Sequence, residues 1–309
     1  MLGHTSRRDD KPMKHASGPN AAILVALGAV AACWPGATAI AEAKASEAAV
    51  EACADDPYQD DPDLLALREG MLAPGSPMTV AAIPPGTREK AAQAHKFEQA
   101  SKERDWANLC RYKNANAKLV SSGHGPTTVF MGDSISEFWR EGDSSLFAGG
   151  NVNRGISGQT SSQMLLRFYG DVIRLRPRVV HLLAGTNDVA ANTGPISDDD
   201  FLGNILAMID LAEANRVKMV LGSIPPAASF FWNPKLQPAE RIDRLNQRLR
   251  RLAAERRLEF VDYFAALSDD QGGLRAGLSN DGVHPNRSGY AVMRPLAEAA
   301  IKRALHRVP

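Results

Sequence analysis

The chain has 309 residues, of which 44% are hydrophobic and 23% charged, values typical of a globular protein with a sizeable core. Its 36 basic and 35 acidic side chains leave a formal net charge of +1. Such a balance provides no one-sided positive field, so nucleic acid is excluded as the expected partner.

Residues 1–39 have the pattern of a signal peptide. Basic side chains precede an apolar run over residues 21–32, which is shorter than the roughly 20 residues that a membrane-spanning helix needs. Trp-Pro-Gly then ends the run, and Ala-Thr-Ala at residues 37–39 offers a cleavage site. We therefore expect a periplasmic or secreted protein. Two alternatives stay open: an uncleaved anchor, and a lipid anchor on Cys33, which follows Val-Ala-Ala.

Residues 40–126 predict an N-terminal extension that is irregular at first and then helical. Asp and Pro punctuate residues 46–86, whereas residues 88–117 contain neither Pro nor Gly. Large apolar side chains recur at roughly helical spacing in that second part, at Phe97, Trp106, Leu109 and Tyr112. We expect one or two helices there, packed on the main domain.

Cysteine usage agrees with an oxidising compartment. Removal of the leader leaves Cys53 and Cys110, an even pair that can form a disulfide, with two free thiols as the alternative. No cluster of cysteine and histidine has the spacing of metal ligands, so zinc is not expected.

Residues 127–309 predict a single α/β domain. Short apolar runs indicate strands at Thr127–Met131, Val152–Ile156, Val179–Ala184, Lys218–Ile224 and Leu258–Phe264. Helical patterns alternate with them, at about residues 161–175, 199–215, 239–256 and 287–306. This alternation favours a three-layer α/β/α sandwich around a mostly parallel, flavodoxin-like sheet of about five strands. Ligands of such folds bind beyond the carboxyl ends of the strands.

Polar motifs follow these strands. Ser134, in Met-Gly-Asp-Ser, comes directly after the first strand, where a helix N-terminus could hold an oxyanion. Gly155 allows a close backbone approach to a ligand, and Asn187 has a carboxamide donor. Each has an ordinary alternative when taken alone: a helix cap for Ser134, a turn glycine, and a turn asparagine.

A fourth motif, Asn-Asp-Gly-Val-His-Pro, precedes the last helix. Asp281 lies three residues before His284 across a glycine, so its carboxylate can turn back onto the imidazole and fix its tautomer. A solvated turn with a surface histidine is the alternative. Of the seven histidines only His284 is so placed, and His181, inside a predicted strand, is expected to be a core residue.

The four motifs together, in this order at strand ends, resemble the SGNH (GDSL-like) serine ester hydrolases. The resemblance covers about Thr127–Val308 and is closest to bacterial GDSL lipases and esterases and to the catalytic subunits of platelet-activating-factor acetylhydrolase. It implies that Ser134 is a nucleophile, that Asp281 and His284 complete a triad, and that Gly155 and Asn187 join the Ser134 N–H in an oxyanion hole.

The resemblance implies a carboxylic-ester hydrolase that acts through an acyl-enzyme on Ser134 and requires no cofactor or metal. Its substrate would be a small-molecule, carbohydrate or lipid ester, with no stable protein partner. After the fourth strand, Phe230, Phe231 and Trp232 stand together in a loop and are predicted to bind substrate; core packing is the alternative. The competing function is a non-catalytic envelope binding protein that kept the fold.

Overall fold

The computed structural model describes Cys53 and residues 56–75 and 83–307. The predicted signal peptide and the alternative anchor at Cys33 lie outside the described residues. From Cys53 onward the chain forms one compact unit. The predicted boundary at residue 127 therefore separates two regions of sequence that pack as one body.

The sheet consists of five parallel strands. They are β1 (Thr128–Gly132), β2 (Asn151–Gly155), β3 (Val179–Leu183), β4 (Lys218–Gly222) and β5 (Glu259–Val261). Their order across the sheet is β2-β1-β3-β4-β5, the order of flavodoxin-like folds, and the predicted fold class is confirmed.

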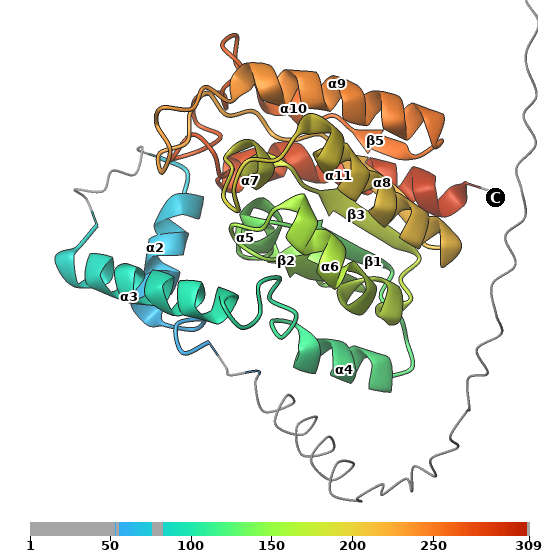
Figure 1. The fold of residues 1–309 in the computed structure, drawn as a ribbon, viewed down its shortest axis with the longest axis horizontal. Helices are drawn as coiled ribbons and strands as arrows, with labels where there is room; N and C mark the ends of the chain where they lie inside the picture. Colours follow the sequence, from blue (N-terminus) through green and yellow to red (C-terminus); the bar gives the residue numbers. More distant parts are fainter. Residues whose placement is uncertain (1–52, 54–55, 76–82, 308–309) are drawn as a thin grey trace, which may run out of the picture. The chain divides into compact units, whose positions relative to one another are not determined.

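Helices cover both faces of the sheet (Figure 1). One layer contains α6 (Ser161–Asp171), α8 (Asp198–Ala214) and α9 (Ala239–Glu255). The other layer contains α5 (Ser134–Gly142), α10 (Tyr263–Leu267) and α11 (Arg287–His306). Shorter elements connect these, at η2 (Ser144–Phe147), η3 (Ile173–Leu175) and α7 (Thr186–Val189).

Side chains of the central strand β1 alternate between two cores. Val129 and Met131 pack with α6 and α8, whereas Phe130 faces the opposite layer, and all three are completely buried. A strand buried on both faces has to be apolar throughout, which is why the sequence shows a continuous run here instead of alternation.

The strand register brings distant motifs to one edge. Gly132, the last residue of β1, pairs with Gly155 of β2 and with Leu183 of β3. The chain segments that leave these three strands therefore emerge side by side.

Among its described residues, the extension contains three helices, α2 (Pro62–Leu72), α3 (Pro85–Lys102) and α4 (Lys113–Ser121). A disulfide joins Cys53 to Cys110, which is one of the two outcomes that the even cysteine count left open. Residues 103–112 form turns and not the expected helix, which leaves Trp106 and Leu109 exposed. Within the residues described, no helix is long and apolar enough to cross a membrane.

Candidate active site

Ser134, His284 and Asp281 form a continuous hydrogen-bonded chain. The Oγ of Ser134 lies 2.8 Å from Nε2 of His284, and Nδ1 of His284 lies 2.6 Å from Oδ2 of Asp281. The serine and the histidine are 150 positions apart in the sequence. The fold therefore brings together the first and the fourth motif at the carboxyl edge of the sheet.

Local backbone geometry presents each of these side chains. Asp133 is the N-cap of α5, and its Oδ1 accepts the N–H of Ile135 at 2.9 Å, so that Ser134 begins the helix. On the other side, Oδ1 of Asp281 accepts the backbone N–H groups of Val283 and His284, at 2.9 and 2.8 Å. One carboxylate thus holds both the backbone and the ring of the histidine.

The surroundings of Asp281 determine where the protons lie among these three side chains. Burial alone would raise the pKa of Asp281, but the hydrogen bond and charge of His284 and two backbone N–H groups outweigh it and lower the pKa to about 2. The ionised carboxylate is only an acceptor, so Nδ1 of His284 carries the proton. Its Nε2 is therefore free to accept the hydroxyl hydrogen of Ser134.

Asp133 has the opposite environment. Its carboxyl is buried, which raises its pKa to about 7 although the N–H of Ile135 and the nearby His284 oppose the shift. Its Oδ2 lies 3.3 Å from Nδ2 of Asn187. Asn187 is thereby placed next to the residue that precedes Ser134.

The carboxamide of Asn187 is held at both ends. Its Oδ1 accepts a hydrogen bond from Nδ2 of Asn192 at 2.6 Å, and its Nδ2 donates to the carbonyl of Gln159 at 3.0 Å. The first contact orients the amide so that Nδ2 faces Asp133 and the loop after β2. Of the two contacts that Nδ2 makes, the 3.3 Å one to Asp133 is the weaker and the easier to exchange for a ligand.

Gly155 does not have the environment that its predicted role needs. Its N–H donates to Oδ1 of Asn153 at 2.8 Å and is not available to an oxyanion. A Cβ at this position would lie 2.2 Å from the backbone nitrogen of Glu137. Gly155 therefore serves the close packing of β2 against α5, and its assignment to the oxyanion hole is corrected.

Gly158 is a candidate N–H donor that the sequence reasoning did not single out. It lies in the loop after β2 with a φ of +74°, and a Cβ placed on it would meet nothing within 4 Å. Among the described residues no acceptor is found for its N–H. A signal was present, because Gly155 lay inside a predicted strand, where N–H groups are normally paired, and Gly158 lay just beyond it.

The three aromatic residues after β4 differ in how far they are buried. Phe230 is completely buried in the core beside α8 and α9, so its predicted substrate contact is wrong: no surface of it is available. Phe231 is 61% exposed and Trp232 is 38% exposed. Trp232 stacks on Phe230 and donates its indole N–H to Oδ1 of Asn192 at 3.0 Å. Through Asn192 this loop is connected to Asn187.

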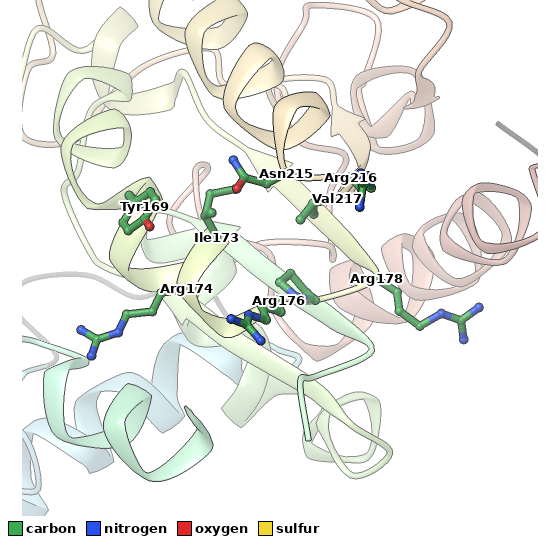
Figure 2. A pocket seen from close by; sticks show the side chains of 9 residues that line it. Tyr169, Ile173, Arg174, Arg176, Arg178, Asn215, Arg216 and Val217 are labelled. Atoms are coloured by element: carbon green, nitrogen blue, oxygen red, sulfur yellow. The ribbon is translucent and has the colours of Figure 1, made fainter. Parts of the chain in front are cut away.

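A hollow of about 500 Å³ lies at the other edge of the sheet. It lies before β3 and β4, so it is remote from Ser134. Its lining residues are Tyr169, Ile173, Arg174, Arg176, Pro177, Arg178, Asn215, Arg216 and Val217. Figure 2 shows Arg174 and Arg178 extending in opposite directions. The guanidinium groups of Arg174 and Arg178 therefore do not converge on one point of the hollow.

Comparison with known sequences decides the family. Residues 130–292, more than half of the chain, match the GDSL-like Lipase/Acylhydrolase family. The chain belongs to this family. It is accordingly a hydrolase of ester bonds, and the resemblance inferred from the four motifs is confirmed.

Several relatives of this GDSL-like hydrolase are known. An acetylxylan esterase of Geobacillus stearothermophilus is 28% identical over 204 residues, which are 55% of this chain and 91% of that protein. A GDSL-like lipase from Bacteroides thetaiotaomicron, known from a crystal structure, is 41% identical in sequence. The two structures superpose with a TM-score of 0.61 over 64% of this chain and 98% of the other. A 78-residue segment, 24% of this chain, is 32% identical to 32% of YqeF, an uncharacterized lipoprotein of Bacillus subtilis.

Proposed function

We propose that this protein is a serine-dependent carboxylic-ester hydrolase that forms an acyl-enzyme on Ser134. The observation that carries the proposal is the unbroken chain from Oγ of Ser134 through His284 to the ionised Asp281. A non-catalytic binding protein, the competing function, has no use for a serine whose hydroxyl is aimed at a free imidazole nitrogen.

The reaction would proceed in two halves. Nε2 of His284 accepts the hydroxyl proton as Oγ of Ser134 attacks the ester carbonyl, and Asp281 stabilises the imidazolium. The imidazolium then gives its proton to the leaving alkoxide, which departs as the alcohol. In the second half a water molecule loses its proton to His284 and attacks the acyl-enzyme. The bond from the acyl carbon to Oγ of Ser134 then breaks, and the imidazolium returns the proton to that oxygen, which releases the carboxylic acid and restores both residues. The chemistry uses no metal or cofactor.

The developing oxyanion needs fixed donors. We assign this role to the N–H of Ser134, the N–H of Gly158 and Nδ2 of Asn187. The first lies at the N-terminus of α5, where the helix leaves backbone N–H groups unpaired and carries partial positive charge. The second has no acceptor among the described residues, and the third exchanges its 3.3 Å contact with Asp133 for the oxyanion.

We propose acetyl esters of carbohydrates as the substrate class, with aryl and lipid esters as weaker substrates. The support is the acetylxylan esterase relative, of which the alignment covers 91%. Phe231 and Trp232, both exposed, would bind the substrate, since aromatic side chains provide flat apolar surface for a sugar ring.

We also propose that the mature protein works in the periplasm or outside the cell. The leader-like pattern of residues 1–39 and the disulfide between Cys53 and Cys110 support this location. Anchoring through an acylated Cys33 is the alternative, supported by the segment similar to a lipoprotein.

The decisive test is Ser134→Ala. The wild-type protein should be labelled covalently by a fluorophosphonate and should hydrolyse acetylated sugars and an aryl acetate. The variant should lose labelling and about 10⁴-fold or more of its kcat, because only the nucleophilic hydroxyl is removed. If the folded variant kept more than roughly a tenth of the wild-type rate, the proposal would be wrong.

A further inference from the structure

The turns that connect α3 to α4 lie against the loop that leaves β2. The carbonyl of Ala107 accepts a hydrogen bond from Nε2 of Gln159 at 2.8 Å, and that of Trp106 accepts one from Nε2 of Gln163 at 2.7 Å. In addition, the hydroxyl of Tyr112 donates to the carbonyl of Gly155. A short stretch of the extension thus contacts the end of β2, the loop that follows it and the first turn of α6.

A buried ion pair completes the contact. Arg111 donates to Oε1 of Glu137 at 2.9 Å, and both side chains are largely buried, at 21% and 11% exposure. Oε2 of the same carboxylate accepts the N–H of Ser157 at 2.8 Å and its hydroxyl at 2.6 Å. Burial alone would raise the pKa of Glu137, but Arg111, Arg68 and Ser157 outweigh it, so the carboxylate is ionised.

The loop held in this way carries one donor of the candidate oxyanion hole and the hydrogen-bond partner of another. Ser157 immediately precedes Gly158, and the carbonyl of Gln159 accepts the hydrogen bond from Asn187. A shift of Ser157 would therefore move one donor directly and the other through its partner. Oxyanion donors act by being fixed in advance, so small displacements are costly to the rate.

We propose that Arg111 is a positioning residue of the enzyme: acting through Glu137 and Ser157, it fixes the loop that carries Gly158. This inference rests on the proposed function. It also gives the extension a role that the hydrolase family match does not include, because Arg111 precedes the matched residues 130–292.

The experiment compares four full-length variants with the wild type on a short aryl acetate. Arg111→Ala should lower kcat about 10- to 100-fold with KM nearly unchanged. Arg111→Lys keeps a cation beside Glu137 and should recover most of that loss. Lys90→Ala is the matched control, since Lys90 joins α3 to Asp61 and Asp63 of the α2 region without touching the loop, and should leave kcat unchanged.

The double variant Arg111→Ala/Glu137→Gln separates positioning from stability. Arg111→Ala alone leaves a buried carboxylate unpaired, which lowers the thermal midpoint. The double variant removes that charge, so its midpoint should recover while kcat stays low, because an amide without Arg111 does not fix the loop. If kcat recovers together with the midpoint, Arg111 acts only through stability and the inference is overturned.

Hydrogen exchange gives a readout that does not depend on turnover. The amide of Ser157 should exchange at least about tenfold faster in Arg111→Ala than in the wild type or in Lys90→Ala. Unchanged exchange would overturn the positioning role even if the esterase assignment held. Conversely, faster exchange in a protein that shows no Ser134-dependent hydrolysis would support the link and refute the proposed function.

Discussion

At the scale of single residues, the role of a donor in the site depends on the hydrogen bonds that it already makes before substrate binds. Asn187 has acceptors for its Nδ2 in the free structure, and one of them, the carboxyl of Asp133, is 3.3 Å away. Such a donor gains little from a ground-state ester, whose carbonyl oxygen is nearly neutral. It gains more from the oxyanion of the tetrahedral intermediate, because a charged acceptor forms the stronger hydrogen bond.

This reasoning predicts the kinetics of Asn187→Ala. We expect kcat to fall by about 10²–10³ with KM little changed, which is the result for a donor used mainly in the transition state. Steady-state kinetics on an aryl acetate measure both constants, with the exposed Asn215→Ala at the opposite edge as a control. A rise in KM at constant kcat would make Asn187 a substrate-binding residue instead.

The two glycines after β2 also show the limit of reading single residues. Gly155 and Gly158 look alike in the sequence, and only the position of the strand end separates their roles. The N–H of Gly155 donates to a side chain of its own strand, whereas Gly158 takes a positive φ in the open loop. Motif matching identifies such a segment, but three-dimensional placement is needed to choose the residue.

At the scale of elements, apolar strands and long helices could be predicted and the irregular segments between them could not. Helix α11 begins and ends at the expected residues, because it has a strong cap at Asn286 and a regular apolar face. Residues 103–112 were expected to be helical and form turns instead. Asp105 accepts the N–H groups of Leu109 and Cys110 there, a local bond that competes with helix formation.

The loop after β4 leads to a prediction about substrate choice. Trp232 is 38% exposed and rests on the buried Phe230. Trp232→Ala should change the ranking of acetyl against longer acyl esters while the thermal midpoint changes little, because Trp232 lies at the surface and not in the core. Trp232→Phe keeps the stacked ring and loses only the hydrogen bond to Asn192, so it should keep the ranking.

Chain-length preference and thermal midpoint are measured on the same samples. A buried aromatic ring removed from a core costs about 3–5 kcal/mol. An unchanged preference together with a loss of that size would assign Trp232 to the core and remove it from the substrate site.

Removal of the disulfide is expected to lower the free energy of unfolding. Cys53 and Cys110 are 57 positions apart, and for a loop of this length chain entropy predicts a loss of about 4 kcal/mol when both are replaced by Ser. Denaturant unfolding of Cys53→Ser/Cys110→Ser against the oxidised wild type measures it, with the reduced wild type as a second reference. A loss below about 1 kcal/mol would show that the bridge contributes little to the free energy of unfolding.

At the scale of the whole molecule, two buried titratable groups oppose one another. Burial lowers the pKa of His181 from 6.5 to about 3, and it raises the pKa of Asp133 from 3.8 to about 7. The histidine therefore reduces stability as pH falls from about 6.5 toward 3, since it is neutral in the folded chain and charged in the unfolded one. The carboxyl reduces stability as pH rises from about 3.8 toward 7.

His181→Gln should remove the first of these effects and leave the second. Between pH 7.5 and 4.5 the stability of the variant should improve relative to the wild type by about 2–3 kcal/mol, since each pKa unit corresponds to 1.36 kcal/mol. Comparing the two pH values cancels the constant cost of altering the contact with Tyr263. If the free energies of unfolding of the two proteins changed in parallel with pH, the lowered pKa of His181 would be refuted.

The fold class follows from the sequence because the whole sheet is built on one repeated pattern, an apolar strand followed by an amphipathic helix. The chain Ser134–His284–Asp281 is equally accessible to motif reasoning. The contact of Arg111 with Glu137 is not, since an arginine in an irregular segment has no periodicity, and its partner is fixed only when the extension packs on α5.

The distance along the chain between Ser134 and His284 has a consequence for biosynthesis. In the proposed mechanism, Ser134 is the nucleophile and leaves the ribosome 150 residues before its base, His284. A nascent or truncated chain that lacks the segment preceding α11 therefore carries a serine with no proton acceptor beside it. On the proposed mechanism, the hydroxyl should become reactive only when the segment before α11 docks, so an incomplete chain should be inert toward esters.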